Sequence, residues 1–229
     1  MLIFAVRHGQ TDWNLEGRFQ GRTDIPLNQN GEKQAEESGA ILAQFNLRQV
    51  VTSPLARARA TGKIIAETAG TANLLTDERL TERSLGSYEG LYIASKPDYF
   101  GKWDADDGSM EPLADVRKRM RSAVCAIEGE GPAAVVSHGA ALNALLFEVS
   151  GGLVGTGITR LVNGSVSVLG LDGVDGGLIL LACNLPPQAL LRWARAQGPA
   201  VTAPETSNAE RLAALKTPLA APRAYGALG

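Results

Sequence analysis

The sequence predicts an α/β fold, a three-layer α/β/α sandwich in which helices cover both faces of a mainly parallel sheet. Short, continuous apolar segments alternate along the chain with segments of helical periodicity. Such apolar segments are typical of strands buried on both faces, and their alternation with helices is typical of a parallel sheet. Of the 229 residues, 45% are hydrophobic and 20% are charged, as in ordinary globular proteins.

The first predicted element is a buried strand over residues 2–6, which are all apolar. Residues 7–30 are polar and rich in Gly, Asn and Asp, and we predict a loop there. A helix is predicted from Gly31 onward. The positions that would form its buried face recur at steps of three and four residues, at Ala35, Ser38, Ile41, Leu42 and Phe45.

The second buried strand is predicted over residues 49–53. A helix follows it to about residue 68, with Pro54 in its first turn and Ser53 as its N-cap. Residues 73–75 are predicted to form a short edge strand.

Residues 77–111 show no sustained periodicity, and we interpret them as a long functional loop or insertion. The amphipathic pattern of residues 113–127 predicts a helix. A basic cluster at residues 117–121 is expected to form the solvated face of that helix.

The chain then repeats the pattern of strand and helix. Residues 133–137 are predicted to form a third buried strand, and residues 140–149 the helix after it. Two more strands are predicted over residues 165–171 and 178–182, joined by a turn rich in Gly and Asp.

The composition changes near residue 185, after which proline and alanine become frequent. We therefore predict one domain over residues 1–185 and a C-terminal extension over residues 186–229. The extension is expected to carry short helices at residues 187–197 and 208–216 rather than a second core.

The charge balance excludes several classes of partner. With 22 basic and 24 acidic side chains the net charge is −2, so no broad basic surface is expected for nucleic acid or membranes. The chain has no apolar run of about 18 residues and no signal-peptide pattern at its start. Its two cysteines cannot form a disulfide framework, so we expect a cytoplasmic location.

The sequence contains only two histidines, His8 and His138, so imidazole chemistry must use one or both of them. Each follows a predicted buried strand and precedes a glycine, and Arg7 and Arg57 lie in equivalent places. Because the carboxyl ends of parallel strands meet at one edge of a sheet, we expect these side chains to lie close together. A purely structural role is the alternative for either histidine taken alone.

Two guanidinium groups and an imidazolium would make a compact cationic site that suits a phosphate dianion, because the arginine fork matches phosphate oxygens. A neutral histidine there can act as a nucleophile. Metal binding is the competing interpretation, but no paired His or Cys spacing supports it. The acidic stretch 104–108 does not fit a calcium loop, because Ser109 and Asp115 stand where Gly and Glu are needed. We expect no metal and no cofactor.

Four ordered motifs over residues 1–182 resemble those of the histidine phosphatase superfamily, which includes cofactor-dependent phosphoglycerate mutase and many small phosphatases. They begin with the Arg7-His8-Gly9 segment, which continues to residue 27, and with Ser53-Pro54-Leu55-x-Arg57. Glu82 with Gly86-x-x-Glu89-Gly90 and Ser137-His138-Gly139 complete the set. The resemblance implies a phosphoglycerate mutase-like fold.

The resemblance also implies a role for each matching residue. His8 would become phosphohistidine, with its other ring nitrogen donating to a backbone acceptor. Arg7, Arg57 and His138 would hold the phosphoryl oxygens, and Glu82 would act as general acid and base. The further positions that would bind substrate or phosphate are Asn14, Gln20, Gly21, Arg83 and Gly139.

Two activities remain open within this resemblance, hydrolysis and phosphoryl transfer between carbons of phosphoglycerate. The mutases carry Glu-Arg-His-Tyr in the third motif, a lysine further on and a longer insertion. Here Glu82-Arg83 is followed by Ser84-Leu85, and Ile93 stands at the lysine position. Phosphatase activity on a small phosphorylated metabolite is therefore favoured, with the mutase as the alternative. A silent phosphate-ligand or protein-binding domain is a remote alternative, because His8 and Glu82 are both retained.

Substrate selectivity is expected to come from residues 84–111. Their aromatic side chains could cover the pocket or merely pack the insertion onto the domain, and isolated lysines there are weak candidates for a second anionic group. These residues are Tyr88, Tyr92, Tyr99, Phe100, Trp103, Lys96 and Lys102. The sequence leaves a homodimer open.

Overall fold

The computed structural model describes residues 1–71, 73–96, 108–129, 131–171, 177–198 and 201. Several expectations lie outside the described residues. These are the helix at 208–216, most of the turn between the last two strands, most of the acidic stretch 104–108, and the positions Tyr99, Phe100, Lys102 and Trp103.

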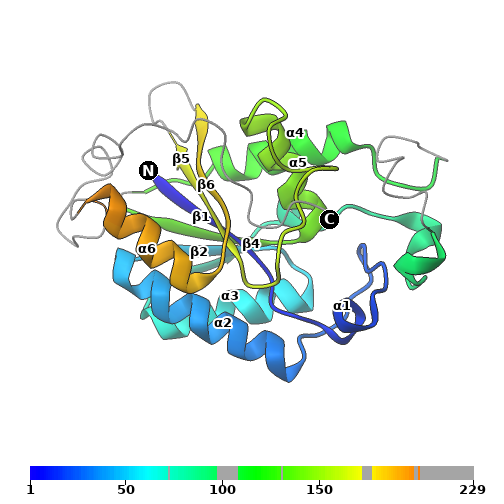
Figure 1. The fold of residues 1–229 in the computed structure, drawn as a ribbon, viewed down its shortest axis with the longest axis horizontal. Helices are drawn as coiled ribbons and strands as arrows, with labels where there is room; N and C mark the ends of the chain where they lie inside the picture. Colours follow the sequence, from blue (N-terminus) through cyan, green and yellow to red (C-terminus); the bar gives the residue numbers. More distant parts are fainter. Residues whose placement is uncertain (72, 97–107, 130, 172–176, 199–200, 202–229) are drawn as a thin grey trace.

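One mixed sheet of six strands forms the centre of the molecule, in the order β3-β2-β4-β1-β5-β6 (Figure 1). The strands are β1 (Leu2–Arg7), β2 (Gln49–Thr52), β3 (Leu74–Thr76), β4 (Ala133–Ser137), β5 (Val166–Leu171) and β6 (Leu178–Leu185). β1 to β4 are parallel, and only β5 runs against its neighbours. The predicted mainly parallel sheet is confirmed.

Helices cover both faces of this sheet (Figure 1). On one face lie α4 (Leu113–Cys125) and α5 (Gly139–Val149), and on the other lie α2 (Gln29–Leu42), α3 (Ala56–Ala69) and α6 (Pro187–Gln197). The predicted three-layer sandwich is therefore confirmed.

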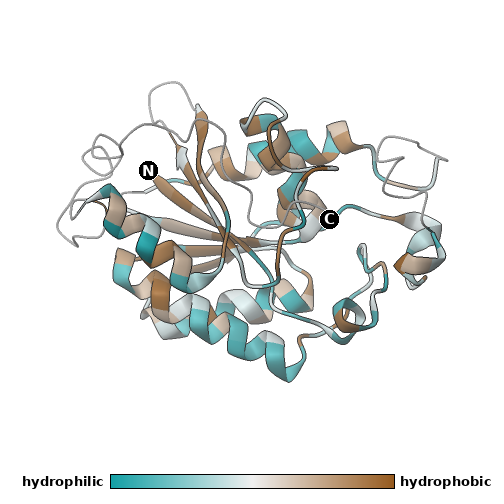
Figure 2. Ribbon diagram, viewed as in Figure 1, coloured by the Kyte–Doolittle hydropathy of each residue, from teal (hydrophilic) through white to brown (hydrophobic). Residues whose placement is uncertain are grey.

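The packing explains why the strands are apolar at every position. In β1, Ile3 and Ala5 belong to the hydrophobic cluster under α4 and α5, while Phe4 and Val6 belong to the cluster under α2, α3 and α6. Successive side chains of a strand point to opposite faces, so a strand between two helical layers has no solvated side. Figure 2 shows this as a hydrophobic sheet with hydrophilic outer helix surfaces.

The predicted loop over residues 7–30 contains a short helix, α1 (Asp12–Glu16), so that prediction is wrong in part. Thr11 caps the helix: its side chain accepts from the Asn14 backbone N–H, and the Asn14 side chain accepts from the Thr11 backbone N–H. This is a capping box with Asn in place of the usual Glu or Gln. A five-residue helix with that substitution has almost no apolar periodicity to reveal it.

The predicted N-cap of α3 is also wrong. The helix begins at Ala56, with Leu55 as its N-cap and no side-chain cap. Ser53 instead directs its hydroxyl to His138, with Oγ and Nε2 2.7 Å apart. Ser53 Oγ also accepts from the backbone N–H of Leu55 at 3.3 Å, but it bonds no N–H group within the helix itself.

Residues 77–111 hold three 3₁₀ turns, at Glu78–Leu80, Gly86–Tyr88 and Ile93–Ser95, within their described part. The basic cluster at residues 117–121 of α4 was expected to be a solvated face, and this prediction is wrong in part. Lys118 is exposed, but the Arg119 side chain is only 16% exposed and pairs with Glu111.

The α6 helix matches the predicted bounds of residues 187–197, and it packs against α2 and β6. Leu190 and Ala194 are fully buried there. No helix in the described part of the chain is both long and apolar enough to cross a membrane.

Candidate active site

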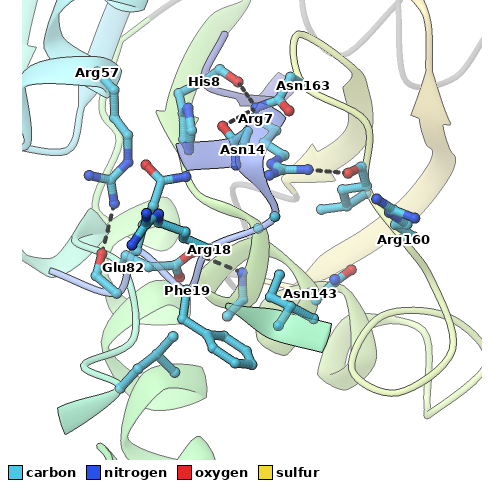
Figure 3. Close-up of a pocket in the computed structure, with 18 of the residues that line it drawn as sticks. Arg7, His8, Asn14, Arg18, Phe19, Arg57, Glu82, Asn143, Arg160 and Asn163 are labelled. Atoms are coloured by element: carbon cyan, nitrogen blue, oxygen red, sulfur yellow. Dashed lines mark hydrogen bonds between the residues drawn. The ribbon is translucent and has the colours of Figure 1, made fainter. Parts of the chain in front are cut away.

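Three chain segments meet at the carboxyl edge of the parallel strands, as predicted from the sequence. Arg7 is the last residue of β1 and His8 follows it, while Ser53 follows β2 and His138 follows β4. The two imidazole rings lie with their centroids 5.1 Å apart. A pocket of about 570 Å³ opens in front of His8 (Figure 3).

Most of the residues that the sequence singled out line this pocket. They are Arg7, His8, Asn14, Gln20, Gly21, Arg57, Glu82 and Gly139. His138 is fully buried beside His8, and Arg83 is buried outside the pocket.

His8 is held in one tautomer. Its Nδ1 lies 2.6 Å from the Gly9 carbonyl oxygen, which can only accept a hydrogen bond, so Nδ1 carries the proton. This is the backbone acceptor expected from the sequence, and it leaves an unprotonated lone pair on Nε2. Burial, together with the charges of Arg57 and Arg7, lowers the pKa of His8 well below its usual value. The ring is therefore neutral at neutral pH.

The backbone around His8 is fixed by Asn163, which the sequence did not reveal. Its Nδ2 lies 3.0 Å from the His8 carbonyl oxygen and 3.1 Å from the side-chain oxygen of Asn14. Asn163 precedes β5, whose amino end lies at the site because β5 is antiparallel to β1. Apolar patterning gives no strand direction, so no signal placed Asn163 here.

Arg57 is fully buried, and a loop holds its guanidinium. It donates to the carbonyl oxygens of Thr23 at 2.8 Å and of Gly21 at 2.7 Å. Glu89 fixes this loop by accepting from the backbone N–H groups of Arg22 and Thr23. Gly21 is required there, because its φ is +51° and a Cβ would lie 2.2 Å from Glu89 Oε1.

Arg7 forms the other cationic wall. Its Nη1 donates to the Leu161 carbonyl oxygen. Burial lowers the pKa of Arg7 to about 10, a shift that Glu82 opposes and Arg160 and Arg57 strengthen. The guanidinium thus stays cationic at neutral pH.

The Nε atoms of Arg7 and Arg57 are both buried and have no hydrogen-bond partner among the described residues. Buried donors without a partner are rare and costly. An oxyanion in the pocket would be a suitable acceptor for them.

The Glu82 carboxylate lies at the amino end of α5. Its Oε1 accepts from the backbone N–H of Ala141 at 2.8 Å, and its Oε2 accepts from that of Ala140 at 3.1 Å. These two backbone N–H groups fix the position of the Glu82 side chain at the pocket wall. Among the described residues that line the pocket, Glu82 is the only acidic one.

His138 is the N-cap residue of α5, and its Nε2 is hydrogen-bonded to Ser53 Oγ. Its Nδ1 is buried without a hydrogen-bond partner among the described residues. Burial and the neighbouring charges of Arg57, His8 and Arg7 lower its pKa well below the usual value. This imidazole is therefore also neutral at neutral pH, and the imidazolium expected from the sequence is not formed, because burial and the neighbouring cations disfavour it.

Arg83 does not take the substrate-binding position expected of it. Its side chain is 1% exposed, and its Nε donates to the Glu111 carbonyl oxygen at 2.7 Å. The pocket instead contains other polar residues that the sequence did not indicate, namely Arg18, Asn143, Arg160 and Asn163.

This arrangement combines an unprotonated imidazole nitrogen with two buried guanidinium groups and one carboxylate. Such a set can attack phosphorus, stabilise equatorial phosphoryl oxygens and exchange a proton. No group of three or more His, Cys, Asp or Glu side chains suited to a metal ion occurs in the part of the chain that the structure describes.

Comparison with known proteins agrees with this chemistry. The family described as histidine phosphatase superfamily (branch 1) matches residues 3–184. The chain is 39% identical to the uncharacterised phosphatase PhoE of Bacillus subtilis (strain 168) over 72% of this chain and 86% of that protein. It is 35% identical to the probable phosphoglycerate mutase GpmB of Klebsiella pneumoniae (strain 342), over 65% of this chain and 74% of that protein.

Solved structures share the fold. A mycobacterial glucosyl-3-phosphoglycerate phosphatase in complex with VO3 superposes with a TM-score of 0.70 at 29% identity, covering 80% of this chain and 98% of that one. YhfR of Bacillus stearothermophilus gives a TM-score of 0.68 at 29% identity, covering 78% of this chain and 94% of that one.

Proposed function

The chain belongs to the histidine phosphatase superfamily, and from this premise we propose that it is a cytoplasmic phosphomonoesterase acting on a small phosphorylated metabolite through a phosphohistidine on His8. The observation that carries the proposal is the His8 ring. Its proton is held on Nδ1 by the Gly9 carbonyl, and its Nε2 is free in a pocket with two buried arginines.

In the first step, His8 Nε2 attacks phosphorus opposite the ester oxygen. The N–P bond forms as the P–O bond breaks, and protonated Glu82 gives its proton to the leaving oxygen. Arg7 and Arg57 stabilise the equatorial oxygens, each with an Nε that has no other partner among the described residues. The His138 ring lies beside the His8 ring and stabilises the same phosphoryl oxygens.

In the second step, water attacks the phosphohistidine. The Glu82 carboxylate removes a proton from the water as its oxygen bonds to phosphorus, and the N–P bond breaks. Inorganic phosphate leaves, His8 is neutral again, and Glu82 has regained its proton. The cycle consumes one ester and one water and releases one alcohol and one phosphate.

The mutase alternative shares the first step but returns the phosphoryl group to a carbon-bound hydroxyl. Similarity to GpmB keeps this alternative open. Two observations support hydrolysis instead. The third motif departs from that of the mutases at Ser84-Leu85. Arg83, which was expected to bind substrate, is bound to the Glu111 carbonyl outside the pocket.

The test is to trap the intermediate with ³²P-labelled phenyl phosphate, quenching in denaturant at alkaline pH. We expect acid-labile, alkali-stable label on wild type, mapped to the peptide with His8, and none on His8→Asn. A folded wild type that hydrolyses nothing and carries no label would overturn the enzyme proposal.

A second assay separates the two activities. With 3-phosphoglycerate as substrate, a phosphatase releases phosphate faster than it forms 2-phosphoglycerate. The reverse ratio would assign the chain to the mutases.

A further inference from the structure

The wall of the pocket beyond Arg7 carries a second arginine, Arg160. It belongs to the segment between α5 and β5, is exposed, and lines the pocket. Figure 3 shows it on the side of Arg7 and Asn143, across the view from Arg57. It is therefore placed to meet the part of a substrate that extends away from the reacting phosphorus.

The backbone that carries Arg160 is held on both sides. Asn184 Nδ2 lies 3.0 Å from the Arg160 carbonyl oxygen, and Asn184 Oδ1 accepts from the Val162 N–H at 2.9 Å. The carbonyl oxygen of Leu161 accepts from Arg7 itself. The base of the Arg160 side chain thus has a fixed position relative to the phosphate-binding guanidinium.

The charge of Arg160 is uncompensated within the described residues, where no carboxylate forms an ion pair with it. Its charge helps to lower the pKa of Arg7, after the larger effect of burial, so the two cations are near neighbours. Arg18, another arginine in the pocket, differs: it pairs with Glu16 and lies 4.1 Å from the centre of the Tyr92 ring.

We propose that Arg160 binds a second anionic group of the substrate, a carboxylate or a second phosphate, while the transferred phosphoryl group lies against His8. The inference rests on the proposed function, since it assigns a class of substrate to the same pocket. An unpaired arginine fork suits either anion. Phe19, Leu85 and Ile93 line the pocket as well and provide apolar contact for the carbon skeleton.

The experiment compares substrates that differ only at the end remote from the ester. These are propyl phosphate, 3-(phosphonooxy)propanoate and propane-1,3-diol bisphosphate. For wild type we expect kcat/KM to be about tenfold higher for one or both doubly anionic substrates, the size of one charged hydrogen bond. Which of the two is preferred tells whether the second anion is a carboxylate or a phosphate.

Arg160→Gln is expected to abolish this preference, while the matched variant Arg18→Gln in the same pocket retains it. Added salt should weaken the preference in wild type, because the Arg160 side chain is solvent-accessible. Equal kcat/KM for all three substrates in wild type, or a preference that survives in Arg160→Gln, would overturn the inference.

A binding measurement separates this inference from the proposed function. Titration calorimetry with 4-phosphonobutanoate and butylphosphonate, neither of which has an ester to hydrolyse, requires no turnover. Tighter binding of the former to wild type but not to Arg160→Gln supports the anion site even if catalysis fails. Equal affinity for the two compounds rejects the site even if the protein is an active phosphatase.

Discussion

At the scale of single residues, the site depends on keeping two imidazoles neutral inside a cationic cluster. His8 and His138 are 2% and 0% exposed, and arginine charges lie beside both. Protonating either ring would add a buried charge next to Arg7 and Arg57. The same environment that provides an unprotonated nucleophile therefore makes the folded state sensitive to acid.

The first prediction concerns stability below pH 6.5. Burial and the arginine charges lower the pKa of His8 and His138 in the folded state. Above pH 6.5 both histidine side chains are neutral in the folded and in the unfolded chain. Below it the unfolded chain binds protons that the folded chain does not, so the free energy of unfolding falls by up to about 1.4 kcal/mol per pH unit for each histidine. Urea unfolding between pH 7.5 and 5.5 measures the slope.

The matched variant for this measurement is His8→Asn, which removes one of the two groups. Between pH 6.5 and 5.5, the free energy of unfolding of this variant should change less steeply with pH than that of wild type. The difference is the contribution of one histidine, up to about 1.4 kcal/mol per pH unit. Identical slopes would show that His8 is protonated in the folded protein.

The second prediction concerns Asn163, whose side chain holds His8, Gly9 and Asn14 together. Asn163→Ala should lower kcat about tenfold or more, because small displacements of a nucleophile are costly, and should change KM less. Steady-state kinetics with 4-nitrophenyl phosphate measure the changes in kcat and KM separately. A change confined to KM would mean that Asn163 contacts the substrate rather than positioning His8.

The site residues that could be predicted were those that directly follow the ends of the parallel strands or lie in recognisable motifs. Asn163 and Arg160 could not be predicted, because they precede an antiparallel strand whose direction the apolar pattern does not give. Arg83 was expected to bind substrate but is buried outside the pocket, where its Nε donates to the Glu111 carbonyl, and the motif pattern carries no signal for this tertiary contact.

At the scale of elements, the Glu82 carboxylate is positioned by two helices. The backbone at the amino end of α5 donates to the carboxylate directly. A side chain of α4 holds the loop segment that precedes Glu82. Arg119 of α4 donates to the Arg79 carbonyl oxygen at 2.7 Å and to that of Thr81, the residue before Glu82. Glu111 in turn holds Arg119 at 2.7 Å.

The third prediction follows from this ion pair, whose side chains are 16% and 14% exposed. Burial alone would raise the pKa of Glu111, but the hydrogen bond and charge of Arg119, together with the charge of Arg22 and the Ser84 N–H, lower it overall. Arg119→Met should lower the free energy of unfolding by about 2 kcal/mol, because Glu111 then keeps only the more exposed Arg22 as an ion-pair partner and the carbonyls of Arg79 and Thr81 lose a donor. Urea unfolding at pH 7 measures the loss.

The control for this prediction is Arg121→Met on the same helix. Its partner Glu148 is 3.5 Å away and the pair is half-exposed, so the change should be within about 0.5 kcal/mol. Equal losses for the two variants would mean that helix propensity, not the buried pair, sets the effect.

The sequence predicted the elements best where burial was complete. Each central strand was visible because helices cover both of its faces, and α6 was found with its observed bounds. The α1 helix was missed because five residues with an Asn in the capping box have no apolar face. The start of α3 was misplaced because Ser53 has the side chain of a cap but bonds to His138.

At the scale of the whole molecule, net charge and local charge have opposite signs. The chain carries a net charge of −2, yet the described residues that line the pocket include four arginines and a single carboxylate, Glu82. The arginines are Arg7, Arg18, Arg57 and Arg160. A total close to zero excludes a broad cationic surface but says nothing about charges gathered at one edge of the sheet. Repulsion among these cations works against folding, and an anion in the pocket relieves it.

The last prediction is that inorganic phosphate stabilises the folded protein. A ligand that binds only the folded state at ten times its dissociation constant raises the free energy of unfolding by about 1.4 kcal/mol. Arg57→Met should lose this stabilisation, because it removes one of the two pocket guanidiniums whose buried Nε has no partner among the described residues. Arg59→Met, an exposed arginine on the same helix, should keep it. Thermal unfolding with phosphate, against chloride at equal ionic strength, separates binding from screening. A phosphate-induced rise in Tm that persists in Arg57→Met would mean that the anion binds elsewhere on the molecule.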